Sequence, residues 1–288
     1  MRWTPGGVSA NIEDRRGMGG GGGFGFGRGP QVGCGGAIIL LVLSLLTGKN
    51  FFALFDGSGG AGMQSPAGQT STAPVEQTPE EKQTVEFISD VLDDVQSTWT
   101  GVFQKEGMTY QETTLVLFRD VTGTACGTGQ AASGPFYCPG DGKVYLDLGF
   151  FDELDRRFEA PGDFAQAYVV AHEIGHHVQN LVGTSDRVQE AMQRDRRNAN
   201  DYSVRLELQA DCYAGIWANS AAQRDVLEAG DVEEGLGAAA AVGDDRIQEM
   251  SGRAANPDSF THGSAQQRME WFNRGLRSGR IQDCETFE

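Results

Sequence analysis

Three of the chain's four histidines fall within one short stretch, VVAHEIGHHVQN, which spans residues 169–180. Apolar residues recur around it at helical spacing, which predicts one helix that begins at Asp163 and ends at Gly183. His172 and His176 are four residues apart, so their imidazoles lie one turn apart on a single face. Two nitrogens at that separation can bind one tetrahedral Zn²⁺ at about 2.0–2.1 Å each.

Glu173 follows the first of these histidines and is offset from it by about 100° around the helix. It is poorly placed to be a metal ligand, but it can reach a water molecule bound to the ion. Zinc lowers the pKa of that water toward about 7, and a neighbouring carboxylate can accept the proton. His177 points away from the shared face, so we expect it to pack or hydrogen bond. The pattern is H-E-x-x-H, which also recurs by chance on amphipathic helices.

The next strongly helical segment, SVRLELQADCYAGIWANS, offers a third ligand. Glu207 and Asp211 are four residues apart on one face of this largely apolar segment, and carboxylates in such surroundings need a partner. We expect Glu207 to complete a His₂Glu site with an open fourth position, as hydrolytic zinc requires. We expect Asp211 to accept the far N–H of a ligand histidine and so to fix its orientation. The alternative is a solvated acidic face.

His262 lies in a loop before another predicted helix, in the stretch SFTHGSAQQRMEWFNRGL. Together with Arg268 it is a candidate for stabilising the oxyanion of a tetrahedral intermediate. The alternative is a buried structural histidine.

The N-terminal part of the chain differs in composition from the rest. Residues 1–33 hold much of a glycine-rich run that cannot build a core, so we predict a disordered cytoplasmic tail. Arginines outnumber acidic residues in this tail, whereas the whole chain has a formal net charge of −17. A protein with this much negative charge repels the phosphate backbone of nucleic acids, so we expect no nucleic-acid partner.

The segment AIILLVLSLLTGKNFFALF contains an uninterrupted apolar run over residues 37–47. A membrane span needs about 20 residues, which the segment reaches only when its flanks are counted. A buried core helix is disfavoured, because glycine-rich segments flank the run and offer nothing to pack against. A cleaved signal peptide is disfavoured because no clear cleavage site follows. A lipoprotein is disfavoured because Cys34 lies before the apolar run. We therefore predict a transmembrane signal anchor over 34–55. The preceding arginines place the N-terminus in the cytoplasm and the body outside it, so the expected location is the cell membrane.

Residues 56–77 are rich in small residues and are predicted to form a flexible linker. The folded domain is expected over 78–288. It begins with Thr78 as the cap of a helix over about 80–104, and strands are predicted over 113–118 and 143–148. The patterns that follow are helical.

Four cysteines lie in this domain, and an exported domain with four cysteines is expected to form two disulfides. Three pairings are possible, of which we favour Cys126–Cys138 and Cys212–Cys284. No close C-x-x-C pair is present, so a cysteine zinc site is not expected.

On these motifs the chain resembles the family of "putative neutral zinc metallopeptidases", which are membrane-anchored bacterial proteins. The resemblance runs from end to end, through MRW…NIEDRRG, AHEIGHHVQN, LELQADCYAG and SFTHGSAQQR. More widely, the chain is similar to gluzincins, in which a Glu-x-x-x-Asp helix follows the zinc helix. The resemblance implies an α+β, zincin-like fold, mainly helical with a small sheet. It also implies that Glu207 is a ligand and that Asp211 lies behind a histidine.

We therefore expect a single-pass, membrane-anchored zinc endopeptidase that acts on a protein or peptide substrate. Zn²⁺ is held by His172, His176 and Glu207, while Glu173 activates the water and later protonates the leaving amine. The strand over 143–148 is expected to hold the substrate in extended form by edge pairing. Two other functions remain open: a zinc hydrolase of a non-peptide bond, and a non-enzymatic envelope protein with structural zinc.

Overall fold

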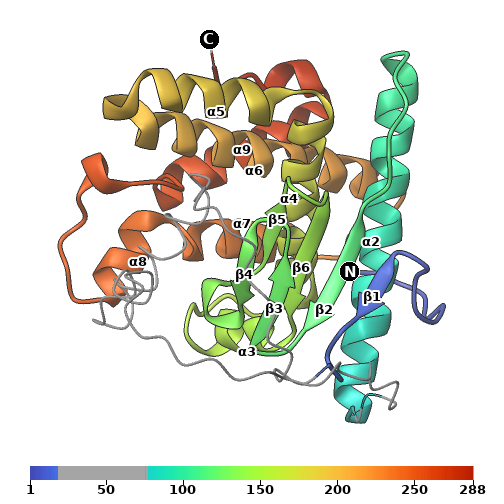
Figure 1. Cartoon of the computed structure of the whole chain (residues 1–288). Coiled ribbons are helices and arrows are strands. Elements are labelled where there is room, and N and C mark those ends of the chain that lie inside the picture. The colour runs from blue at the N-terminus through green and yellow to red at the C-terminus, as the bar shows by residue number, and fades with distance from the viewer. Residues whose placement is uncertain (19–74, 76, 288) are drawn as a thin grey trace, which may run out of the picture.

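The long helix α2, Pro79–Lys105, begins at a reciprocal cap. The Thr78 hydroxyl accepts the backbone N–H of Glu81, and the Glu81 carboxylate accepts that of Thr78. Apolar side chains at helical spacing cover one face of α2, and they are buried against the rest of the body. The structure is a computed structural model that describes residues 1–18, 75 and 77–287, and in it the helix predicted over 80–104 is confirmed (Figure 1).

A four-stranded sheet has the strand order β1-β2-β6-β5. Its members are β1 (Ile12–Asp14), β2 (Thr114–Phe118), β5 (Phe136–Cys138) and β6 (Lys143–Asp147). Strands β1, β2 and β6 run parallel to one another, and β5 runs antiparallel to β6. Both predicted strands are present, but β6 has a partner on each edge. The edge expected over 143–148 is therefore covered by β5 along residues 143–145, and within the described residues only Leu146 and Asp147 of β6 lack a strand partner on that side.

A hairpin of β3 (Val121–Thr124) and β4 (Gly127–Gln130) lies over the outer surface of β5. The backbone of Gly129 approaches the ring of Phe136 so closely that a Cβ there would lie 2.6 Å from it. The predicted Cys126–Cys138 disulfide ties the hairpin turn to β5, and the predicted Cys212–Cys284 disulfide is also formed.

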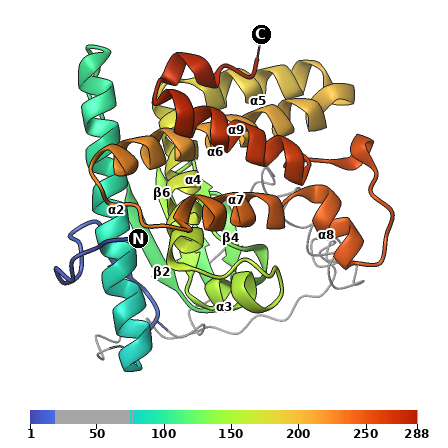
Figure 2. The same ribbon diagram turned by 180° about the vertical axis from the view of Figure 1, so that it is seen from behind.

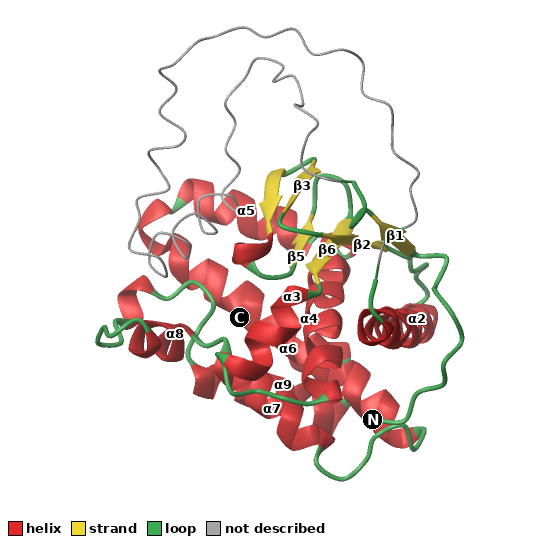
Figure 3. Cartoon of the chain, turned by 90° about the horizontal axis from the view of Figure 1, so that it is seen from below, coloured by secondary structure: helices red, strands yellow, loops and turns green. Residues whose placement is uncertain are grey.

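Helices fill the other side of the sheet (Figures 2 and 3). The central one is α4 (Asp163–Leu181), which contacts β5 and β6 on one side and α6 and α7 on the other. The other α-helices of the described residues are α3 (Gly149–Arg156), α5 (Thr184–Arg194), α6 (Ala199–Gln223), α7 (Asp231–Ala241), α8 (Asp244–Met250) and α9 (Ala265–Ser278). Because α4 is enclosed by sheet and helices, most of its residues are buried.

Glycines allow the helices around α4 to approach at backbone distance. A Cβ on Gly275 of α9 would lie 1.9 Å from the carbonyl oxygen of Cys212 in α6, so these two backbones touch. At the crossing of α4 and α6, a Cβ on Gly175 would lie 3.0 Å from the carbonyl oxygen of Ala210. The absence of side chains at these points draws α6 close to both neighbours.

Residues 1–18 do not follow the prediction of a disordered tail over 1–33. β1 pairs with β2, with Ile12 opposite Leu115, and the ammonium group of Lys143 in β6 lies 2.6 Å from Glu13. The α-amino group of Met1 is buried and lies 2.7 Å from the carboxylate of Asp163, at the start of α4. The segment gains order because it supplies an edge strand and at least two ion pairs to the domain.

The fold-class prediction needs one correction, which concerns the membrane anchor. Within residues 1–18 and 77–287, none of the helices has both the length and the apolar character needed to cross a membrane. The predicted anchor over 34–55 lies outside the described residues, as does nearly all of the predicted linker. The structure supports an α+β body that is mainly helical with a small sheet.

We predict that Gly275→Ala lowers the free energy of unfolding by about 1–3 kcal/mol, because the new methyl group forces α9 away from α6. Urea denaturation of the full-length protein measures the change. The matched control is Gly237→Ala, since Gly237 lies in α7 with nothing within 4 Å of an added Cβ. That substitution should be neutral or stabilise by up to about 1 kcal/mol. Equal stability of the two variants would contradict the close crossing.

Candidate metal site

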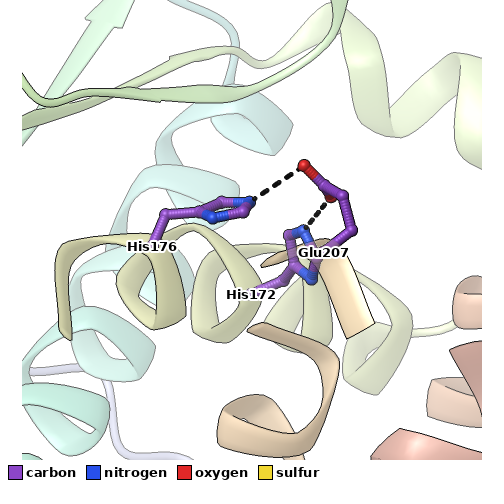
Figure 4. A group of neighbouring side chains, drawn as sticks. All are labelled: His172, His176 and Glu207. Atoms are coloured by element: carbon purple, nitrogen blue, oxygen red, sulfur yellow. Dashed lines mark hydrogen bonds and ion pairs between the residues drawn. The ribbon is translucent and has the colours of Figure 1, made fainter. Parts of the chain in front are cut away.

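His172 and His176 of α4 face Glu207 of α6, and Figure 4 shows the three side chains converging. The Nε2 atom of His172 lies 3.2 Å from one carboxylate oxygen of Glu207, and the Nε2 atom of His176 lies 3.5 Å from the other. One donor atom from each residue lies within 4.8 Å of the other two. The structure thus brings together the three ligands predicted from the sequence.

These distances fit zinc. Donors bound at about 2.0–2.1 Å at the corners of a tetrahedron are about 3.3–3.4 Å apart, close to the two separations between histidine and glutamate. Imidazole nitrogen and carboxylate oxygen are both common zinc donors. In the described part of the chain no fourth histidine, cysteine or acidic residue joins the group, and three protein donors leave a coordination position for water or substrate.

Both histidines are held through the ring nitrogen that faces away from Glu207. The Nδ1 atom of His172 lies 2.9 Å from Asp211, and the Nδ1 atom of His176 lies 2.9 Å from the side-chain oxygen of Gln179. A ring that donates from Nδ1 keeps the lone pair of Nε2 free for a metal. The structure therefore places Asp211 where the sequence analysis expected it and adds Gln179, which lies one turn beyond His176.

Asp211 is fully buried and is held by more groups than the sequence indicates. Besides His172, it accepts hydrogen bonds from the Tyr168 hydroxyl at 2.5 Å and from two nitrogens of Arg268 at 2.9 Å each. Burial acts to raise the pKa of Asp211, but the charges of Arg268 and His172 hold it below its usual value. Arg268 thus pairs with Asp211, and its Nη2 atom also lies 3.3 Å from Nδ1 and 3.4 Å from Nε2 of His172. The expectation that Arg268 joins His262 at an oxyanion stays a prediction.

Glu173 is also buried, with 8% of its surface exposed. Burial raises its pKa, although the neighbouring charges of His176 and His172 oppose the shift. A raised pKa brings a carboxylate closer to the range in which it both accepts and returns a proton at neutral pH.

His262 lies on the loop before α9 and keeps 27% of its side-chain surface exposed. Asp244, at the start of α8, accepts the backbone N–H groups of Thr261, His262 and Gly263 and lies 3.3 Å from the His262 Nδ1. Burial opposes protonation of His262, but Asp244 and the charge of Glu207 raise its pKa. One carboxylate therefore shapes the loop and orients the imidazole near the metal site. Sequence reasoning missed Asp244, which no local pattern marks.

His177 lies away from the metal ligands, in agreement with its predicted role. Its Nε2 donates to the carbonyl oxygen of Gln111 at 2.6 Å, and its Nδ1 accepts from the Tyr137 hydroxyl at 3.1 Å. Asn180 donates to the same hydroxyl at 3.0 Å. These contacts fasten β5 to α4.

The three donors are arranged as in proteins that build a mononuclear metal site on an H-E-x-x-H helix and take a third donor from a following helix. More particularly, the chain belongs to the family described as "Putative neutral zinc metallopeptidase", which matches residues 1–287.

Relatives of the chain occur in Escherichia coli and Mycobacterium tuberculosis. "Uncharacterized protein YpfJ" of Escherichia coli K12 is 46% identical over 296 residues, which cover 100% of this chain and 99% of the relative. "Uncharacterized protein Rv2575" of Mycobacterium tuberculosis H37Rv is 46% identical over 182 residues, or 59% of this chain and 61% of the relative. No solved structure matches the chain.

We predict that Glu207→Ala leaves the protein largely free of zinc, because two protein donors remain. Asp211→Asn should weaken zinc binding by about 10–100-fold, because it removes an outer partner and not a ligand. Competition titration against a chelator measures both affinities.

The control for these variants is Asp201→Asn, which alters an exposed carboxylate of α6 paired with Arg205 and should bind zinc like the wild type. If Glu207→Ala titrates like the wild type while Asp211→Asn is metal-free, the assignment of the two carboxylates is reversed.

Proposed function

We propose that the protein is a zinc-dependent endopeptidase that uses Glu173 as the general base. The observation that carries this proposal is the placement of a buried carboxylate directly after the first of three metal donors. Hydrolysis needs a metal with an accessible position and a base beside it, and a purely structural zinc site needs neither.

Zinc, when bound by His172, His176 and Glu207, supplies a Lewis acid and lowers the pKa of water at the site. Glu173 accepts a proton from the attacking water and returns it to the leaving amine. Asp211 and Gln179 keep the two imidazoles in the orientation that binding requires.

We assign His262 to the oxyanion that forms on the substrate carbonyl. Asp244 holds its Nδ1 side and favours the charged ring, so the opposite nitrogen is free to donate to substrate. Arg268 contacts Asp211, Tyr168 and His172, and we do not assign it to this task.

β5 is our candidate for the strand that holds the substrate. It ends the four-stranded sheet in the described residues, so one of its edges has no strand partner. Tyr137 fastens this strand to α4 through His177 and Asn180, close to the helix that carries both histidine ligands. An extended peptide can add to such an edge through backbone hydrogen bonds, which favours a peptide over an ester as substrate.

We predict that Glu173→Gln retains zinc but hydrolyses a fluorescently labelled, unfolded casein at least about 10²-fold more slowly, because an amide cannot accept the proton. The matched control is Glu190→Gln, which alters an exposed residue of α5 and should leave the rate unchanged. Wild-type turnover by Glu173→Gln would refute the assigned role. A zinc-loaded wild type that cleaves small esters but no peptide would favour a hydrolase of another bond.

We predict that His262→Ala lowers kcat by about 10²-fold, as expected for the loss of one oxyanion donor, while zinc affinity stays within a few fold of the wild type. Asp244→Asn should cause a smaller loss of kcat, because the imidazole remains but is less firmly oriented. Steady-state kinetics with the casein substrate test both. An unchanged kcat for His262→Ala would return this residue to a structural role.

A further inference from the structure

Gln179 is a glutamine with no solvent exposure in the middle of the metal site's supporting structure. Its side-chain nitrogen lies 2.7 Å from the backbone carbonyl oxygen of Leu206, which can only accept a hydrogen bond. The nitrogen must therefore face Leu206, and the oxygen must face the Nδ1 of His176. It follows that His176 carries its proton on Nδ1 and presents Nε2 toward Glu207.

The same amide is the first member of a longer chain of contacts. The nitrogen of Gln179 also lies 3.2 Å from the side-chain oxygen of Gln209, whose own nitrogen donates to the carbonyl oxygen of Cys284 at 3.0 Å. Gln209 is 3% exposed, and Cys284 is fully buried. A relay of two buried amides thus joins the ligand His176 to the C-terminal turn.

The far end of this relay is fixed covalently. Cys284 closes the short turn Ile281–Cys284 and is bonded to Cys212 of α6, five residues beyond the ligand Glu207. Leu206, whose carbonyl oxygen accepts the shorter hydrogen bond from Gln179, directly precedes Glu207 in the sequence. The amide of Gln179 therefore bonds one metal ligand directly and the backbone beside another.

We propose that Gln179 is the positioning residue for His176 and that the Cys212–Cys284 disulfide, acting through Gln209, anchors it. This inference rests on the metal site that the proposed function uses. The two histidines then have unlike supports, because His172 is held by a carboxylate and His176 by a neutral amide. Loss of the amide removes the partner of the His176 N–H and frees the ring to turn away from the metal.

The experiment compares Gln179→Met with Gln96→Met in the full-length chain by chelator competition for zinc. Gln96 is a matched control because it is 1% exposed, lies on α2, and accepts the backbone N–H of Thr113 away from the metal ligands. Both substitutions remove a buried amide and should lower the midpoint of thermal unfolding. Only Gln179→Met should weaken zinc binding, by about 10–100-fold.

Gln179→Glu in its protonated form provides a partial rescue, since one oxygen accepts from His176 while the carboxyl O–H replaces the N–H that Leu206 accepts. Below the pKa of this buried carboxyl, the variant should bind zinc more tightly than Gln179→Met. Paired serine substitutions test the anchor. The double substitution at Cys212 and Cys284 should weaken zinc binding several-fold, whereas the same change at Cys126 and Cys138 should not.

Zinc affinity of Gln179→Met equal to that of the wild type would overturn this inference and leave the proposed function intact. An equal loss of affinity in Gln96→Met would also overturn it, because the effect would then reflect general destabilisation. A wild-type chain that takes up no zinc would overturn both.

Discussion

The buried charge of Asp211 is the constraint around which the helices are arranged. A carboxylate without access to water is costly unless positive and hydrogen-bonding groups surround it, and here α4 supplies Tyr168 and His172 while α9 supplies Arg268. Three helices are thus joined at one residue. Because that residue also holds the Nδ1 atom of His172, the interaction that stabilises the core is the one that would orient this proposed ligand.

Close helix packing serves the same arrangement. Gly175 lies between the two histidine ligands, where it brings no side chain to the crossing of α4 and α6. The short distance between α4 and α6 lets the side chain of Glu207 reach the imidazoles of both His172 and His176. The crossing of α6 and α9 at Gly275 then holds α6 from its other side. The H-E-x-x-H segment therefore supplies the candidate ligands and also the glycine that lets α4 pack closely against α6.

The sequence predicts what is local. Helical spacing indicated His172, His176, Glu207 and Asp211, and the cap at Thr78 indicated the start of α2, because each signal lies within a few residues. The sequence did not predict features that depend on contacts between segments far apart in the chain. The position of Arg268, the support from Asp244, the inner place of β6 and the pairing of β1 all follow from tertiary packing. A three-residue strand such as β1 carries too little alternation to be recognised.

The parallel pairing of β1 with β2 has a consequence for biosynthesis. Ile12 leaves the ribosome well before its partner Leu115, and at about 5–20 residues per second the delay is roughly 5–20 s. Asp163, which receives the amino group of Met1, is made later still. The β1 segment must therefore stay unpaired until the sheet and α4 exist, and it is exposed to other chains and chaperones during that interval.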